Sequence, residues 1–257
     1  MKKVLLSVLL LVAMAAGFAA CGQPTIEPPT TPAQILQLFN DATAQVAARK
    51  PGYSKSRYTK ITALDFGPLS GLAMVKESAY AFLGVESSGE GTVSYTVKKG
   101  ESSSLLRASE WTMADIESAA CERDGNGGYI VTLKVIDGTT RWGGNGGDDP
   151  GSGTKKSAVD NGPFCYGEDD SPEYDHKTAL NLYYTVNHTE GAATRDIGET
   201  VTGVQVTANI DSKGRLTGLT GHLAMRVDVY DVTYSIFNLS DCSGEGYGDV
   251  TYSDFKY

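Results

Sequence analysis

Two stretches near the C-terminal end of the chain alternate strictly between apolar and polar residues. Their apolar members are Val204, Val206, Ala208 and Ile210 in the first stretch, and Leu223, Met225, Val227 and Val229 in the second. A repeat of two residues is the period of a β-strand, and the polar sequence at 211–214 between the stretches predicts a turn. Each strand then has one apolar face. The pair therefore predicts an antiparallel sheet with one buried face and one face that is wet or lines a groove.

Further strands are expected on both sides of this pair. The sequences at 54–66 and 93–97 have strand composition, and the Gly/Asn cluster at 124–128 predicts a hairpin turn. In the run that follows this turn, Ile130, Leu133 and Val135 are expected to be buried. The apolar alternation changes phase near Tyr230–Asp231, which predicts a bulge, and residues 250–255 form a candidate last strand.

The first clear element is a helix over 32–50. Thr31 is a candidate N-cap, Pro32 suits the first helical position, and Gln34 completes a capping box. Its apolar stripe consists of Ile35, Leu38, Phe39, Ala42 and Val46. A second helix is expected over 69–83, and 112–116 is expected to form a single capped helical turn. Residues 176–187 fit either a helix or a strand, with the helix favoured.

These elements predict an α+β fold, with one curved antiparallel sheet and two or three helices packed on one of its faces. Residues 138–172 differ in composition from the rest, because they are rich in glycine and aspartate and have few aliphatic side chains. We expect them to form a surface loop or insertion that is dispensable for folding. The domain prediction is a single α+β domain over 32–257 that carries this insertion.

The N-terminal end has the pattern of an export signal. Lys2 and Lys3 precede an apolar run at 4–20, which ends in Phe18-Ala19-Ala20-Cys21. Small residues ahead of a cysteine resemble the lipobox of bacterial lipoproteins. The resemblance implies that residues 1–20 are a signal peptide and that lipid on Cys21 attaches the chain to a membrane, facing outside the cytoplasm, at the cell surface or in the periplasm. The Pro- and Thr-rich residues 21–31 then form a flexible tether.

Charge limits the classes of partner. Removal of residues 1–20 takes away Lys2 and Lys3, which leaves 20 basic and 31 acidic residues, a net charge of −11. Nucleic acids require a concentrated basic surface, so we expect no nucleic-acid partner. If Cys21 carries lipid, three cysteines remain, namely Cys121, Cys165 and Cys242. They permit either one disulfide with one free thiol or three free thiols.

No sequence motif indicates a catalytic, metal or cofactor site. Ser70 lies between glycines without GxSxG spacing and is better explained as a cap, and the three histidines (His176, His188 and His222) lie in unrelated segments. The acidic run at 168–175 lacks calcium-loop spacing and is interpreted as solvated rather than as a weak calcium site. We therefore expect a protein that is not an enzyme and binds no cofactor.

The architecture implies two candidate functions. An N-terminal helix followed by long strands in a lipoprotein is loosely similar to the half-barrel lipoprotein carriers of the LolA and LppX type, and the helix end at 50–53 also resembles lipoproteins of Gram-positive bacteria that have no known function. The first resemblance implies that an apolar or amphipathic ligand binds between sheet and helices. The candidate ligand face consists of Val204, Val206, Leu223, Met225, Val227 and Val229. The alternative is a surface interaction or structural module with no small-molecule site. Aromatic residues such as Tyr234, Tyr247 and Tyr252 could also form a sheet face that binds sugars or acyl chains, although such rings more often form the edge of a core.

Overall fold

The computed structural model describes residues 29–82, 85–143, 158–166, 171–172, 190, 192–234 and 237–257. The signal peptide, Cys21 and most of the tether lie outside these residues. So do the ambiguous segment at 176–187 and the acidic run at 173–175 with its neighbours 167–170. The predictions made for those segments stay predictions.

Helix α2 (Pro32–Arg49) begins and ends where the sequence predicts. The Thr31 hydroxyl accepts a hydrogen bond from the Gln34 backbone N–H, and the Gln34 side chain accepts one from the Thr31 backbone N–H, which completes the capping box. At the other end Lys50 adopts a left-handed conformation and its N–H donates to Val46. All five residues of the expected apolar stripe are buried.

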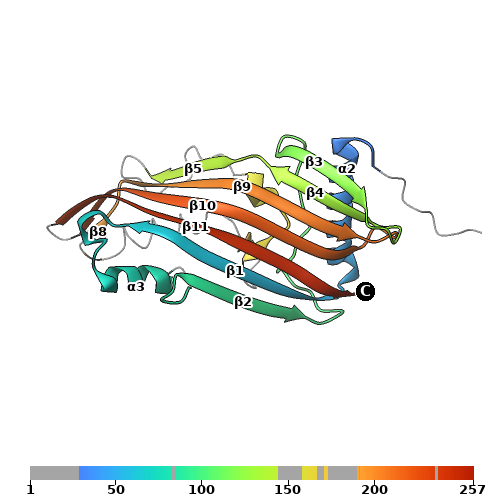
Figure 1. The fold of residues 1–257 in the computed structure, drawn as a ribbon, viewed down its shortest axis with the longest axis horizontal. Coiled ribbons are helices and arrows are strands. Elements are labelled where there is room, and N and C mark those ends of the chain that lie inside the picture. Colours follow the sequence, from blue (N-terminus) through green and yellow to red (C-terminus); the bar gives the residue numbers. More distant parts are fainter. Residues whose placement is uncertain are drawn as a thin grey trace, which may run out of the picture.

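The described strands form one open antiparallel sheet of nine strands in the order β2-β1-β11-β10-β9-β4-β3, with β5 paired to β9 and β8 paired to β10 (Figure 1). The strands are β1 (Gly52–Asp65), β2 (Glu90–Val97), β3 (Ile116–Arg123), β4 (Tyr129–Val135), β5 (Gly138–Gly143), β8 (Ala192–Ala193), β9 (Asp196–Ile210), β10 (Leu216–Tyr234) and β11 (Phe237–Lys256). The fold is therefore dominated by an antiparallel sheet, as predicted.

The two alternating stretches are neighbouring strands, β9 and β10. Asp211 fixes the turn between them, because its carboxylate accepts backbone hydrogen bonds from Lys213 and Arg215. The expected change of phase is also present: the register of β10 against β11 shifts between Val229 and Val232, and Asp231 has a φ of 51°. A second bulge, which lies in β9 rather than β10, was not predicted. It lies at Gly203, whose φ is 65°.

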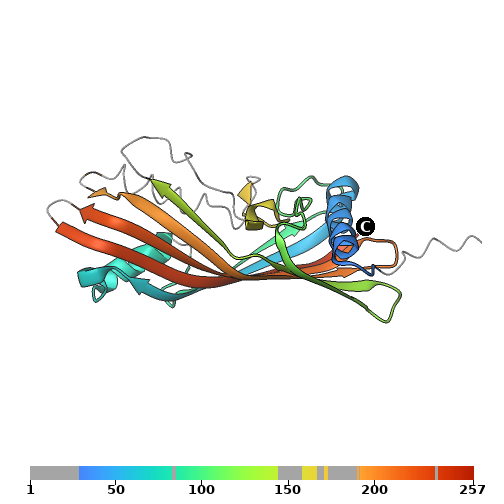
Figure 2. The same ribbon diagram turned by 90° about the horizontal axis from the view of Figure 1, so that it is seen from above.

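One face of the sheet, here called the covered face, carries the hydrophobic core beneath α2 (Figure 2). Phe39 of α2 stacks on Trp111, whose indole N–H donates to the Ala158 carbonyl over 2.7 Å. Phe164 meets the edge of Trp111 and stacks on Tyr252 of β11. The helix, the loop before β3, the segment at 158–164 and the sheet thus share one aromatic core.

The expected cover of two or three helices is not confirmed. Within the described residues, α2 is the helix that packs on the covered face, where it contacts β3, β4 and β10. Helix α3 (Ala73–Phe82) exists close to its predicted position, but it lies beside the end of β1, where Tyr80 contacts Gly89 in the turn before β2 (Figure 1). No helix among the described residues is long and apolar enough to span a membrane.

The hairpin predicted at 124–128 joins β3 to β4, and the Asp124 carboxylate accepts hydrogen bonds from Asn126 and Gly128. The prediction that Ile130 is a core residue is wrong. Ile130 is half-buried and faces away from the core, because the buried positions of β4 are Tyr129, Val131, Leu133 and Val135. The sequence at 112–116 forms a hydrogen-bonded turn rather than helix, and β3 begins at Ile116.

The Gly/Asp-rich segment at 138–172 contributes more structure than its composition indicates. Its first residues form β5, which pairs with β9. Residues 158–161 form a short 3-10 helix, η2 (Ala158–Asn161), and two-residue strands β6 (Cys165–Tyr166) and β7 (Ser171–Pro172) pair with each other. Val159 and Phe164 are 3% and 2% exposed. A few well-placed apolar side chains therefore bring residues 158–164 into the core, whereas we expected a surface loop.

Candidate functional site

The six residues of the expected ligand face divide into two groups. Val204, Val206 and Leu223 are no more than 1% exposed and belong to the core beneath α2. Met225, Val227 and Val229 are half-buried, farther along the covered face, with Met225 packed against the edge of the core. The half of the predicted ligand face nearest α2 is therefore covered by other side chains of the core. Among these six residues, Met225, Val227 and Val229 keep part of their apolar surface exposed in the described structure.

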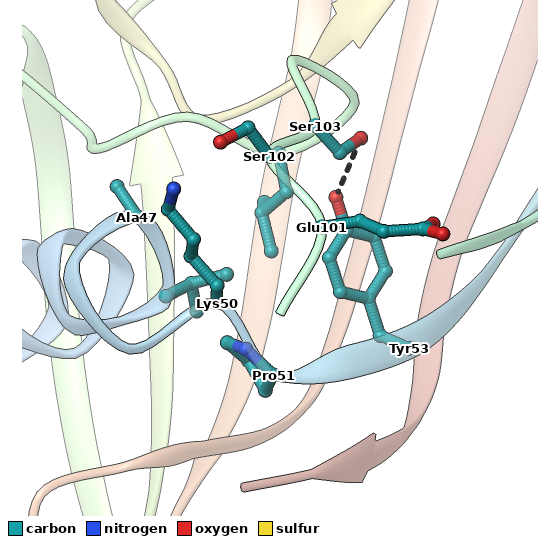
Figure 3. A pocket seen from close by; sticks show the side chains of 9 residues that line it. Ala47, Lys50, Pro51, Tyr53, Glu101, Ser102 and Ser103 are labelled. Carbon is teal, nitrogen blue, oxygen red and sulfur yellow. Dashed lines mark hydrogen bonds between the residues drawn. The ribbon is translucent and has the colours of Figure 1, made fainter. Parts of the chain in front are cut away.

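A small pocket lies at the C-terminal end of α2 (Figure 3). It has a volume of about 210 Å³ and is lined by Val46, Ala47, Lys50, Pro51, Tyr53, Glu101, Ser102, Ser103 and Leu106. The Tyr53 hydroxyl points to Ser103 and donates to its hydroxyl over 3.3 Å, whereas Glu101 points away from the Lys50 amine. Ligand pockets typically have volumes of about 300–1,000 Å³, so this one is too small for an acyl chain.

Of the other candidates named in the sequence analysis, Ser70 stabilises a local turn and two histidines lie outside the described residues. Ser70 accepts a hydrogen bond from the Phe66 N–H and donates one to Asp65, which is the behaviour of a turn residue. His176 and His188 lie outside the described residues. Across the described ranges, no three His, Cys, Asp or Glu side chains converge as metal ligands would, and Cys121 and Cys242 are free thiols.

The opposite face of the sheet, here called the open face, carries polar and aromatic side chains that are half-buried or exposed. Six of them form a contiguous group on β2, β1, β11 and β10, here called the open-face patch: Tyr58, Lys60, Glu90, His222, Tyr247 and Asp249. Strand register places these residues together, because Tyr58 lies opposite Asp249 and Lys60 lies opposite Tyr247. Neighbouring strands are about 4.8 Å apart, so the patch is about 14 Å wide.

One end of the patch is a hydrogen-bonded network between β1 and β2. The Lys60 ammonium lies 2.6 Å from the Glu90 carboxylate, which also accepts a hydrogen bond from the Tyr58 hydroxyl. Desolvation and this bond to Glu90 raise the pKa of Tyr58 to about 12. The bonds from Lys60 and Tyr58 lower the pKa of Glu90. At physiological pH the network therefore contains a neutral phenol, an ammonium group and a carboxylate.

The other end of the patch, on β11 and β10, holds the pair of His222 and Asp249, and Arg226 lies just outside the patch. His222 Nδ1 lies 2.7 Å from Asp249, and both side chains are 48% exposed. Next to them the Arg226 guanidinium donates to Asp228 over 2.7 Å and contacts Glu245. His222 has a carboxylate partner, as a catalytic histidine does, but within the described part of the chain no hydrogen bond joins it to a serine, threonine or cysteine nucleophile.

Sequence reasoning missed most of this patch. Tyr247 was noted as an aromatic residue and His222 as one of three histidines in unrelated segments. The other four members, Tyr58, Lys60, Glu90 and Asp249, were not singled out. The polar positions of an alternating strand are visible in sequence, but their grouping depends on which strands are neighbours. Here β1 pairs with β11, almost 200 positions later in the chain. Comparisons with protein-family models, with curated proteins and with solved structures gave no match.

Proposed function

We propose that this chain is an exported lipoprotein that is held on a membrane by lipid on Cys21 and binds an extracytoplasmic partner through the open face of its sheet. The observation that supports the binding surface is the open-face patch, where aromatic rings and paired charges lie side by side in solvent. A side chain that only keeps a sheet face soluble needs no such ordered contacts. This proposal favours the interaction-module alternative over a carrier for apolar ligands.

The anchor is tested by replacing the cysteine. In cells supplied with labelled fatty acid, the wild-type chain should incorporate the label and a Cys21→Ala chain should not. Acyl chains contribute about 0.8 kcal/mol per buried CH₂, so loss of lipid removes the main membrane attachment. Label on the Cys21→Ala chain would contradict the lipoprotein proposal.

The binding surface is tested on envelopes that have been washed with detergent, which extracts a chain held by lipid alone. We expect part of the wild-type chain to stay with the washed envelopes, and a chain with Tyr58→Ala and Tyr247→Ala to be released. Leu72→Ala is the matched control, because Leu72 is 50% exposed and lies outside the sheet. Complete extraction of the wild-type chain would contradict the proposed role of the open face.

A second candidate function is supported by the apolar surface of Met225, Val227 and Val229. These residues are half-buried on the covered face, where an amphipathic ligand could lie along β10. The test is displacement of a fluorescent fatty acid from the full chain. If this surface is a ligand site, Val227→Glu should abolish binding without a loss of thermal stability. Absence of fatty-acid binding at tens of micromolar would exclude this candidate.

A further inference from the structure

We propose that the open-face patch recognises a neutral carbohydrate chain. This inference rests on the proposed function of the open face and adds to it the chemical class of the partner. It is carried by three features of the described residues, namely the arrangement of the aromatic rings, the supply of hydrogen-bonding groups around them, and the pairing of the charges.

The rings form a small, partly exposed cluster. The centroids of Tyr58 and Tyr247 are 6.1 Å apart with an angle of 54° between the rings, and the His222 ring lies 5.8 Å from Tyr247. Ala224 lies opposite Tyr247 on β10, so the directly facing residue adds only a methyl group beside the ring. A tyrosine offers an apolar ring face and a polar hydroxyl together. A sugar ring has the same dual character, with apolar C–H faces and a rim of hydroxyl groups.

The groups around the rings can both donate hydrogen bonds to sugar hydroxyls and accept hydrogen bonds from them. Arg226 is held in place by Asp228 and Glu245, which accept from three of the five guanidinium N–H groups, so two donors remain in a fixed plane. Asp249 receives His222 on one of its oxygens, whereas a carboxylate has about four acceptor positions in total. Donors and acceptors are therefore preorganised beside the apolar ring faces.

The charges favour a neutral partner over a charged one. Lys60 is paired with Glu90, Arg226 with Asp228 and Glu245, and His222 with Asp249. An anionic polymer or lipid headgroup would have to displace these carboxylates before it reached a cation. A neutral ligand can add hydrogen bonds to the pairs without breaking them.

The open face favours an extended chain over a single sugar. Beside the patch, a row of hydroxyl side chains crosses six strands at one level: Thr132, Thr207, Thr220, Thr251, Ser56 and Ser94. Polar groups thus continue past the aromatic cluster in one direction. A shallow surface makes few contacts with each sugar unit, so measurable affinity requires several units to bind at once.

The test uses the full chain in detergent and isothermal titration with neutral hexasaccharides of glucose, mannose and N-acetylglucosamine. At least one should bind, with a Kd on the order of 100 μM and a less than twofold change between about 0.05 and about 0.5 M salt. Tyr247→Ala should weaken binding about tenfold, whereas Tyr247→Phe, which keeps the ring, should stay within about threefold of wild type. Asp249→Asn, a conservative change, should weaken binding about threefold. Met113→Ala should change nothing, because this residue is exposed in the loop before β3.

Three results would overturn the carbohydrate assignment: no binding to any of the neutral probes, binding that Tyr247→Ala and Asp249→Asn leave unchanged, or binding only to anionic polygalacturonate or a lysine-rich peptide with strong salt dependence. If the neutral probes fail while detergent-washed envelopes still retain the chain through Tyr58 and Tyr247, the ligand class is wrong and the proposed function stands. If both measurements fail, the open face is not the binding surface.

Discussion

At the scale of single residues, short-range hydrogen bonds determine how the strands are joined. Asp211 is the clearest case, because its carboxylate accepts backbone N–H bonds from Lys213 and Arg215 and lies 2.6 Å from the Arg215 guanidinium. Arg215 in turn lies over the ring of Tyr257, whose hydroxyl donates to the Leu216 carbonyl. One carboxylate therefore links the β9–β10 turn to the C-terminal end of the chain.

This arrangement makes Asp211 a pH-dependent contributor to stability. Burial alone would raise the pKa of Asp211, but the hydrogen bonds from Arg215 and Lys213 outweigh it and lower the pKa. A carboxyl group whose pKa is lower in the folded chain stabilises that chain above its unfolded value of about 3.9, and the contribution disappears as pH falls through the folded value.

We expect Asp211→Asn to reduce the free energy of unfolding by about 1–2 kcal/mol at neutral pH, because charged hydrogen bonds become neutral ones. The difference from wild type should shrink as pH falls below about 4. Urea unfolding at a series of pH values measures this difference in the free energy of unfolding. A difference that stays constant down to acidic pH would show that the Asp211 carboxylate is not the source. Lys213→Ala is a control that retains the backbone N–H.

At the scale of elements, packing between distant segments determines which residues form the core. Phe164 comes from the Gly/Asp-rich segment and lies on Gly221 of β10, where an added Cβ would stand 2.6 Å from the Phe164 ring. Glycine is therefore needed at 221 for the segment to approach the sheet so closely. The pair explains how a segment with few aliphatic residues still contributes to the core.

We expect Gly221→Ala to lower stability by about 1–3 kcal/mol through overpacking. Phe164→Ala should cost about 3–5 kcal/mol, because it leaves a cavity beside Trp111 and Tyr252. In the double variant the costs should be less than additive, since removal of the ring makes room for the new methyl group. Thermal or urea unfolding of the three variants gives the coupling free energy between positions 164 and 221. Gly71→Ala is the control, because nothing lies within 4 Å of its Cβ position. Full additivity would contradict the contact.

The elements also show what the sequence can predict. The ends of α2, the turn at Asp211 and the bulge near Asp231 were predictable, because their signals lie within a few residues of each other. The register of β1 against β11 was not, since it joins positions almost 200 residues apart and no local pattern encodes it. The burial of Phe164 was missed for the same reason. The open-face patch depends on that register, so only two of its members were noted from sequence.

At the scale of the whole molecule, the sheet is much longer than its helical cover. Helix α2 has 18 residues and extends about 27 Å, whereas β11 has 20 residues and extends about 65 Å. The helix crosses one end of the covered face, and the open face lies on the other side of the sheet (Figure 2). The lipid proposed on Cys21 lies only 11 positions before α2, so the anchor would hold this end of the molecule close to the membrane.

The central claim is that the open face is occupied in its natural setting, and hydroxyl-radical footprinting tests it most directly. Intact cells and the detergent-purified full chain would be labelled under the same conditions and compared residue by residue. We predict that Tyr58, His222 and Tyr247 are several-fold less reactive in cells, while Leu72 and Met113, which are 50% and 45% exposed and lie outside the sheet, react equally in both samples. Equal reactivity of the three patch residues in cells and in the purified chain would contradict the claim.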